Sequence, residues 1–362
     1  MTTKILTKTL KRIVLLPLTA IYALALVIRH FLYDVGVLKS EKGKLPTLVI
    51  GNIHVGGTGK TPHASAFLSI LAKKLGGEKH VALLSRGYGR KSKGFKWVSE
   101  DSDWSNVGDE PSLLKTIHPL HSIAVCEDRI YGIERIAKEK PEVKVVVLDD
   151  GLQHRALIPD MSVLLIDSER PLNNASLLPG GELRDLKCRS SKFDAWIYTR
   201  CPSDFIPPKL STTSPPKFIF STYMSSSSNS LNEFKNDSIK SEKPRVLAVS
   251  GIAYPERFFD GILESWTVVR RQSYSDHYKF NSKDVADWVA CIRSERLDAI
   301  VTTAKDAVRI KPYTQELKGI PLIVIPIEVR WHEKEALEKF VEEWLESTIF
   351  AKEMGEKHRQ IS

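Results

Sequence analysis

Residues 51–62 read GNIHVGGTGKTP, between a strand-like apolar run at 45–50 and an apolar-periodic segment at 63–75. A glycine-rich turn between a buried strand and a helix directs backbone N–H groups at an anion, and the helix dipole adds to the attraction. The lysine of such a turn reaches the outer phosphates of a nucleotide, and the next hydroxyl can hold Mg²⁺. The stretch therefore predicts a P-loop whose cofactor-binding residues are Gly56, Gly57, Thr58, Gly59, Lys60 and Thr61.

The motif departs from the strict pattern G-x-x-x-x-G-K-[ST], because His54 stands where the first glycine is required. A chance match in a flexible loop is the alternative. The strand–loop–helix context and the four glycines within residues 51–59 favour the P-loop. The motif alone indicates nucleotide phosphate and no particular reaction.

The composition is that of a globular protein. The chain has 362 residues, enough for two domains, with 42% hydrophobic and 27% charged residues. Its four cysteines form no C-x-x-C pair, which argues against a disulfide framework or a zinc site and is compatible with a reducing compartment.

Positive charge is concentrated at the N-terminus. The whole chain carries +9, and residues 1–44 hold eight Lys or Arg side chains against two acidic ones. A nucleic-acid-binding face needs its basic residues in the folded body, so we expect no nucleic-acid partner. The clustering instead favours contact with anionic lipids of a membrane surface.

An uncharged apolar run covers residues 13–28, between Arg12 and Arg29. As a helix it would span about 24 Å, which is short for a hydrocarbon core of about 30 Å. A cleaved signal peptide would export the nucleotide site away from ATP, and a buried core helix does not explain the basic flank. A membrane-associated helix in the inner leaflet fits best, and a tilted full span remains an alternative.

The rest of the chain alternates strand-like and helix-like segments. Its near-continuous apolar strands predict an α/β fold, with a P-loop NTPase-like parallel sheet flanked by helices and a second, smaller α/β domain. Residues 203–244 are rich in Ser, Pro, Lys and Asn, which indicates a linker or a connector with a short hairpin near 218–223. The expected organisation is an N-terminal helix region (1–40), a P-loop core (41–205), a linker (206–244), the smaller domain (245–350) and a polar tail (351–362).

Two tandem carboxylates, Asp149 and Asp150, end the apolar run at 145–148. An Asp at the carboxyl end of a strand beside a P-loop strand can bind Mg²⁺ directly or through water, so the pair is a candidate metal site together with Thr61. Gln153 and His154 follow at the same edge, as candidate substrate or phosphate ligands or as parts of a solvated loop.

Further charged motifs lie in loops. In GDEP (108–111), Asp109 either caps a helix or removes the proton of an acceptor hydroxyl, and in SDHY (275–278), His277 either lies in solvent or reaches a carboxylate across a cleft. Arg86 in SRGYGR (85–90) and Arg184 in LLPGGELRD (177–185) could clamp anionic groups or pair with neighbouring acids. The stretch TTAKDAVR (302–309) superficially resembles a guanine-reading element, but Lys305 comes one place late, which counts against a GTPase.

Together with VVLDDGLQHR (146–155), these motifs appear in the order typical of the tetraacyldisaccharide 4′-kinase family, the lipid A 4′-kinases of Gram-negative bacteria, and the resemblance covers residues 12–331. That family tolerates a non-glycine at the place of His54 and carries an N-terminal membrane-associated helix. The resemblance implies transfer of the ATP γ-phosphate, with Mg²⁺, to the 4′-hydroxyl of an acylated glucosamine disaccharide 1-phosphate. It also implies a location at the cytoplasmic face of the inner membrane, and leaves acyl-chain length and oligomeric state open.

The resemblance also implies roles for individual residues. Asp109 becomes the catalytic carboxylate and His277 its partner, with Tyr278 where many relatives have a second histidine. The phosphate-binding lysine and hydroxyl are Lys60 and Thr61, the metal-site pair is Asp149 and Asp150, and Arg184 is a stronger candidate ligand than Glu182.

Two other classes compete with a kinase. A membrane-tethered P-loop ATPase that drives a protein partner would hydrolyse ATP in response to that partner, and a nucleotide-binding scaffold would bind ATP without turnover. Neither needs the additional carboxylate and histidine, so the sequence favours the kinase.

Overall fold

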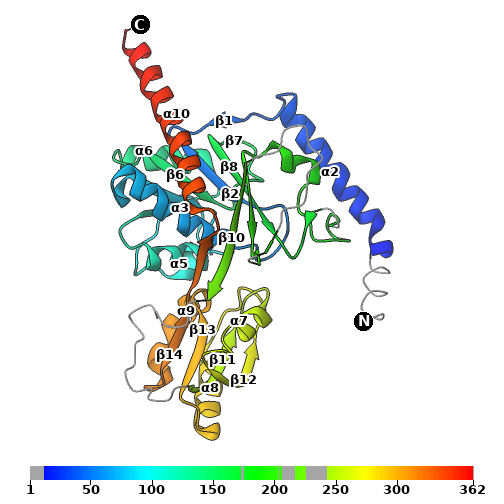
Figure 1. Ribbon diagram of the computed structural model, residues 1–362, viewed down its shortest axis with the longest axis vertical. Coiled ribbons are helices and arrows are strands. Elements are labelled where there is room, and N and C mark those ends of the chain that lie inside the picture. The colour runs from blue at the N-terminus through cyan, green and yellow to red at the C-terminus, as the bar shows by residue number, and fades with distance from the viewer. Residues whose placement is uncertain (1–11, 173–174, 203, 206–216, 226–242, 362) are drawn as a thin grey trace.

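The computed structural model describes residues 12–172, 175–202, 204–205, 217–225 and 243–361. In these residues the strands form a nine-stranded sheet, a four-stranded sheet and a two-stranded ribbon. Figure 1 shows two lobes, with the larger sheet in the upper one and the smaller sheet in the lower one. The expected α/β architecture with a second, smaller α/β unit is confirmed.

The larger sheet has the order β15-β10-β9-β8-β2-β6-β3-β5-β4. Its strands are β2 (Thr47–Gly51), β3 (Val81–Ser85), β4 (Lys96–Trp97), β5 (Ser122–Val125), β6 (Val145–Asp149), β8 (Met161–Asp167), β9 (Ala195–Thr199), β10 (Lys217–Ser225) and β15 (Ile327–Trp331). Neighbouring strands are parallel except at the two edges, where β4 pairs with β5 and β15 with β10 in antiparallel fashion. The P-loop strand β2 lies between β6 and β8, so the carboxyl end of β6 lies beside the P-loop.

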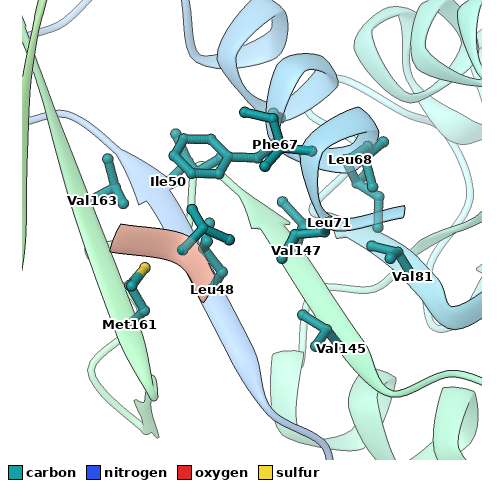
Figure 2. Close-up of a cluster of buried hydrophobic side chains, with 14 of the residues drawn as sticks. Leu48, Ile50, Phe67, Leu68, Leu71, Val81, Val145, Val147, Met161 and Val163 are labelled. Carbon is teal, nitrogen blue, oxygen red and sulfur yellow. The ribbon is translucent and has the colours of Figure 1, made fainter. Parts of the chain in front are cut away.

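Helices cover both faces of this sheet because its central strands are apolar on both sides. The helices of this lobe are α3 (Lys60–Leu75), α4 (Trp104–Val107), α5 (Asp109–Ile117), α6 (Arg129–Glu139) and α10 (Lys334–Ile361). Figure 2 shows the core on one face, where Phe67 and Leu71 of α3 lie against Leu48, Ile50 and Val147 of the sheet. This packing fixes the start of α3, and with it the P-loop, relative to the strand ends.

The smaller lobe is a four-stranded parallel sheet of order β12-β11-β13-β14. Its elements are β11 (Arg245–Ser250), α7 (Pro255–Gly261), β12 (Thr267–Ser273), α8 (Ser282–Glu295), β13 (Ala299–Thr303), α9 (Ala304–Ile310) and β14 (Leu322–Ile325). A small apolar cluster joins the lobes, because Leu113 of α5 packs with Ala304 and Ala307 of α9. The two lobes are therefore in contact near the ends of α5 and α9.

The chain returns to the larger lobe earlier than the sequence suggests. The smaller domain was expected to reach residue 350, but β15 joins the larger sheet and α10 buries Leu337, Val341 and Trp344 in the core of that lobe. The expected polar tail at 351–361 continues α10, and no hairpin forms near 218–223, because β10 pairs with β9 and β15 instead. The rest of the expected linker, at 206–216 and 226–242, and residue 362 lie outside the described residues.

Helix α2 (Leu16–Asp34) begins and ends later than the apolar run at 13–28. Its 19 residues correspond to about 29 Å, close to the thickness of a hydrocarbon core. Among the described residues, it is the one helix long and apolar enough to cross a membrane by length and composition. In Figure 1 it runs along one flank of the larger lobe.

The remaining elements are short. Strands β1 (Glu41–Lys42) and β7 (Leu157–Ile158) pair in the two-stranded ribbon, and the 3₁₀ turns are η1 (Glu78–His80), η3 (Lys187–Lys192) and η5 (Lys311–Leu317).

Candidate active site

The P-loop forms the turn between β2 and α3 that the sequence predicts. Gly56 and Gly59 have φ values of 84° and 86°, a left-handed backbone that favours glycine. The buried amide of Asn52 donates to the Thr58 hydroxyl at 2.5 Å across the loop. Gly59 is the N-cap of α3, whose first residues are Lys60 and Thr61. The backbone N–H groups and dipole of a 16-residue helix therefore begin where a phosphate would bind.

The two tandem carboxylates follow β6 directly and have different partners. The Thr61 hydroxyl lies 3.5 Å from Asp149 Oδ2, and Lys60 Nζ lies 3.6 Å from Asp150 Oδ2. Asp150 has φ 57°, a left-handed backbone conformation that is uncommon outside glycine, so the chain turns directly after the strand. Arg184 forms a close ion pair with Asp150 and also donates to Asn52 Oδ1 at 2.6 Å.

Asp149 fits a magnesium ligand. Within the described residues its buried Oδ1 has no hydrogen-bond partner, although a buried carboxylate oxygen normally has one. Burial, followed by the charge of Glu110, raises the pKa of Asp149 to about 8. A cation would satisfy the oxygen and favour the charged form. Among the described residues, no group of three or more His, Cys, Asp or Glu side chains is placed so that it could hold a metal ion, and Mg²⁺ at phosphate-transfer sites typically needs only one or two carboxylates beside the phosphates.

Asp150 is held as a carboxylate. Burial alone would raise its pKa, but the hydrogen bond from Arg184 and the charge of Lys60 outweigh burial and lower the pKa. Its oxygens already have two cationic partners, whereas Asp149 has a free oxygen. Asp149, next to the Thr61 hydroxyl, therefore has an oxygen free for a cation, whereas Asp150 is paired with Lys60 and Arg184.

The other residues that were expected to bind an anion differ in their contacts and in their exposure. The Gln153 side-chain amide donates a hydrogen bond to the Asn52 carbonyl at 2.9 Å, and this contact holds the start of the P-loop. His154 has a buried Nε2 without a partner in the described structure. Arg86 is exposed at the end of β3. Glu182 lies further along the loop, where its carboxylate is 3.4 Å from Arg170. Gln153 and Arg184 therefore have structural contacts, while Arg86 and His154 remain available to a ligand.

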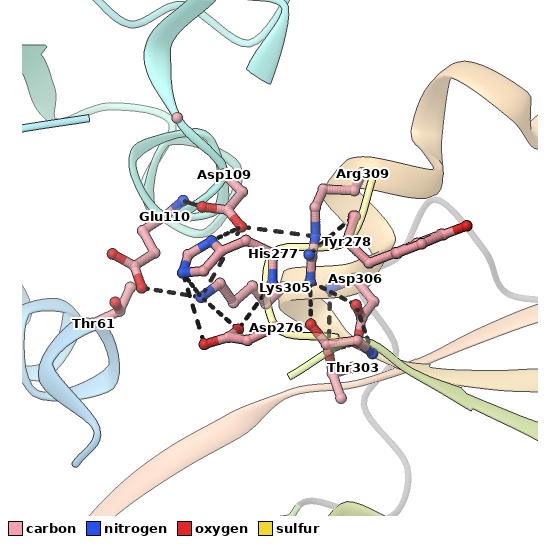
Figure 3. A network of polar contacts seen from close by, with 12 residues as sticks. Thr61, Asp109, Glu110, Asp276, His277, Tyr278, Thr303, Lys305, Asp306 and Arg309 are labelled. Atoms are coloured by element: carbon pink, nitrogen blue, oxygen red, sulfur yellow. Dashed lines mark hydrogen bonds and ion pairs between the residues drawn. The ribbon is translucent and has the colours of Figure 1, made fainter. Parts of the chain in front are cut away.

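The second half of the site lies between the lobes. His277 Nδ1 lies 2.9 Å from Asp109 Oδ2, as Figure 3 shows. Asp109 is the first residue of α5 rather than part of a loop, and it follows Gly108, whose φ is 100°. The Asp109 side chain is 4% exposed, whereas His277 is 30% exposed and sits at a turn with φ 57°.

The environment keeps Asp109 ionised. Burial alone would raise its pKa, but the hydrogen bond from His277 and the positive charges of Lys305 and Arg309 outweigh burial and lower the pKa. A buried carboxylate that is held by a histidine and nearby cations can accept a proton only from a group placed directly against it. Figure 3 draws Thr61 on the same side as Glu110, whose charge acts on Asp149.

Sequence reasoning missed two cations of this half. Lys305 and Arg309, from α9, lie 4.0 Å and 3.7 Å from Asp109 Oδ2. A signal existed for Lys305, because TTAKD follows a buried strand in the same way that the tandem carboxylates follow β6. Arg309 has no such signal, because its burial depends on the folded lobe.

A P-loop beside a strand-end carboxylate, with an aspartate–histidine pair at the junction of the lobes, is the arrangement of a P-loop phosphotransferase. The family model for tetraacyldisaccharide-1-P 4′-kinase matches residues 11–346, and the chain belongs to this family. The expected family resemblance is thereby confirmed.

Individual relatives agree with this result. The chain is 32% identical over 339 residues to the tetraacyldisaccharide 4′-kinase of Phocaeicola vulgatus, covering 87% of this chain and 89% of the relative. It is 34% identical over 336 residues to that of Bacteroides fragilis, covering 87% and 88%. A crystal structure of LpxK from Aquifex aeolicus in complex with ATP superposes with a TM-score of 0.73 at 28% identity, covering 92% of this chain and 99% of that one. The chain is therefore an ATP-using kinase of this family.

Proposed function

We propose that this chain transfers the γ-phosphoryl group of ATP to the 4′-hydroxyl of an acylated glucosamine disaccharide 1-phosphate, in lipid A synthesis. Membership of the kinase family and the printed activity of the relatives support the substrate class. The single observation that carries the reaction type is the hydrogen-bonded pair of Asp109 and His277 beside the P-loop. An ATPase that drives a protein partner has no need of a base for an acceptor hydroxyl.

In the proposed reaction Asp109 accepts the proton of the 4′-hydroxyl as its oxygen attacks the γ-phosphorus. The bond between the γ-phosphorus and the bridging oxygen breaks, and ADP carries the electron pair away. Lys60, the backbone N–H groups of the P-loop and Arg86 stabilise the negative charge that develops on the transferred group. Thr61 and Asp149 would hold Mg²⁺, which would neutralise part of the phosphate charge during transfer.

We propose that the disaccharide binds at the edge formed by Arg86, His154 and the loop that carries Arg184. The loops that carry His154 and Arg184 contact α2, so a substrate held there would have its sugars at the site and its acyl chains toward the helix. Tyr22 of α2 donates its hydroxyl to the Arg184 carbonyl at 2.9 Å, and Arg29 donates to the Gln153 carbonyl at 2.7 Å. The helix is thus fixed to the loops that would contact the sugars.

We also propose that α2 places the enzyme at the cytoplasmic face of the inner membrane, in contact with anionic lipids. Most of its apolar side chains are exposed, and only Leu26 and His30 are buried. The His30 imidazole lies 2.7 Å from the buried Asp185 carboxylate, which holds one flank of the helix to the protein. The opposite flank, with Ile21, Leu24 and Ile28, is free to enter lipid, and ATP is available only on the cytoplasmic side.

The test uses the full chain in detergent with γ-labelled ATP and a lipid A disaccharide 1-phosphate. Label should appear in the lipid at the 4′ position, and an Asp109→Asn variant should fail to transfer it. The proposal would be contradicted if the enzyme bound the lipid and released labelled phosphate without labelling the lipid. That result would support the ATPase alternative.

A further inference from the structure

Lys305 is surrounded by four polar groups at the junction of the lobes. Its Nζ lies 3.1 Å from Glu110 Oε1 and 3.2 Å from His277 Nε2 (Figure 3). It is also 3.7 Å from Asp276 Oδ1 and 4.0 Å from Asp109 Oδ2. The Lys305 side chain is 19% exposed. It is therefore a mostly buried cation in direct contact with the histidine of the pair.

This contact determines where the imidazole proton lies. A lysine ammonium has three donors and no acceptor, so His277 Nε2 must accept the hydrogen bond. The neutral imidazole then carries its proton on Nδ1, which donates to Asp109 Oδ2 at 2.9 Å. We propose that Lys305 is a positioning residue of the transfer reaction, which holds His277 as the neutral Nδ1–H tautomer and leaves Asp109 as the sole base.

The charges around His277 show why the lysine is needed. Two carboxylates lie against the imidazole, Asp109 of α5 and Asp276 of its own turn, while Glu110 of α5 pairs with the Lys305 ammonium. From α9, the cation Lys305 contacts the imidazole and Arg309 lies against Asp109, and the Tyr88 ring lies 5.3 Å from the imidazole, centroid to centroid. The Asp109 carboxylate accepts from Nδ1, and the Lys305 ammonium, which has no acceptor, donates to Nε2.

Arg309 cannot replace Lys305 in this role. Its guanidinium is fully buried and donates to Asp306 at 2.6 Å, to the Gly251 carbonyl at 3.0 Å and to the Tyr278 carbonyl at 3.1 Å. These contacts hold the Arg309 guanidinium beside Asp109, whereas Lys305 contacts the Nε2 atom of His277. Lys305 itself remains charged: burial alone would lower its pKa, but Glu110, Asp109 and Asp276 outweigh burial and raise the pKa.

The inference rests on the proposed phosphoryl transfer and sharpens its proton path. With Nε2 occupied by Lys305 and Nδ1 already protonated, His277 has no site to accept the hydroxyl proton. The proton therefore stays on Asp109 until the product leaves, and His277 orients the carboxylate without sharing the proton. Because Lys305 and His277 come from the smaller lobe and Glu110 from the larger, this arrangement exists only when the lobes are in contact.

Nitrogen-15 NMR of the full chain labelled at histidine, in detergent and without substrate, tests the tautomer directly. A His277→Gln variant assigns the resonances. In the wild type we expect a protonated Nδ1 and an unprotonated Nε2 at neutral pH, and in Lys305→Met we expect Nε2 to gain a proton at higher pH than in the wild type. Lys283→Met, at an exposed lysine of α8, is the matched control and should leave both resonances unchanged.

Steady-state kinetics provide a second test of the role proposed for Lys305. Lys305→Met should lower kcat about tenfold or more at neutral pH, move the acid limb of the kcat profile to higher pH, and be partly rescued by Lys305→Arg. An Nε2–H or doubly protonated His277 in the wild type would overturn the proposal, even if Lys305→Met fails to fold. So would an equal loss at every pH with an unchanged histidine spectrum. If the wild-type enzyme labels no disaccharide, the proposed function fails while the NMR result still decides the tautomer.

Discussion

His277 and Asp109 are 168 positions apart and belong to different lobes, yet their side chains meet at 2.9 Å. The hydrogen bond orients the carboxylate and is the main contribution that lowers its pKa against the opposing effect of burial. Removal of the imidazole should therefore change both the geometry and the ionisation of Asp109.

His277→Ala should move the acid limb of the kcat/KM profile to higher pH, because the pKa of Asp109 rises when its strongest lowering contact is lost. In the wild type this pKa lies below the ordinary 3.8. The contribution of the ionised carboxylate to the free energy of unfolding is then fully present above pH 3.8. It is lost as the pH falls through the pKa that Asp109 has in the folded protein. A pH–rate profile from about pH 3 to about pH 9 measures the shift. An unchanged acid limb would show that Asp109 is not the group that titrates.

Lys60→Ala should nearly abolish turnover while the fold stays intact. The lysine neutralises charge on the transferred group in a site already lined with backbone donors, so its loss acts mainly on the transition state. Steady-state kinetics and a thermal melt measure the two effects. Lys73→Ala, at an exposed lysine of the same helix, is the control. A variant that keeps a substantial share of kcat would contradict the P-loop assignment.

Asp149→Asn should weaken Mn²⁺ binding in the presence of ATP, because the free buried oxygen of Asp149 is the proposed metal ligand. Chelation of the metal should stop transfer by the wild type for the same reason. Electron paramagnetic resonance titration with Mn²⁺ measures the affinity. Equal Mn²⁺ affinity in the variant and the wild type would place the metal on other groups.

Replacement of Ile21, Leu24 and Ile28 by serine should shift the enzyme from the membrane to the soluble fraction. These exposed side chains form the proposed lipid-facing flank of α2, while the contacts of Tyr22, His30 and Arg29 to the active-site loops remain. Activity on substrate in detergent micelles should therefore fall less than activity on vesicles. Deletion of residues 1–30 removes both functions of the helix and should lower both activities.

Sedimentation with vesicles that contain anionic lipids, followed by assays in both media, separates these outcomes. If the serine variant still sediments with the vesicles as the wild type does, another surface anchors the enzyme.

The parts of the site that the sequence could predict are those set by local pattern. The P-loop and the tandem carboxylates sit at the ends of apolar strands, and parallel strands bring their carboxyl ends to one edge. Lys305 could not be assigned a role, because its contact with Glu110 depends on how two lobes pack. The return of β15 and α10 to the larger lobe was missed for a similar reason. Strand pairing and the burial of Leu337 and Val341 depend on partners more than a hundred residues away.

A double-mutant cycle of Asp109→Ala and His277→Ala in kcat tests the central claim most directly. Both single variants should lose much of kcat with little change in ATP affinity, and the double variant should be little worse than the more damaged single, because residues that act as one unit give non-additive losses. Fully additive losses, or a large loss of ATP affinity in Asp109→Ala, would contradict the account of a single carboxylate base held by its histidine.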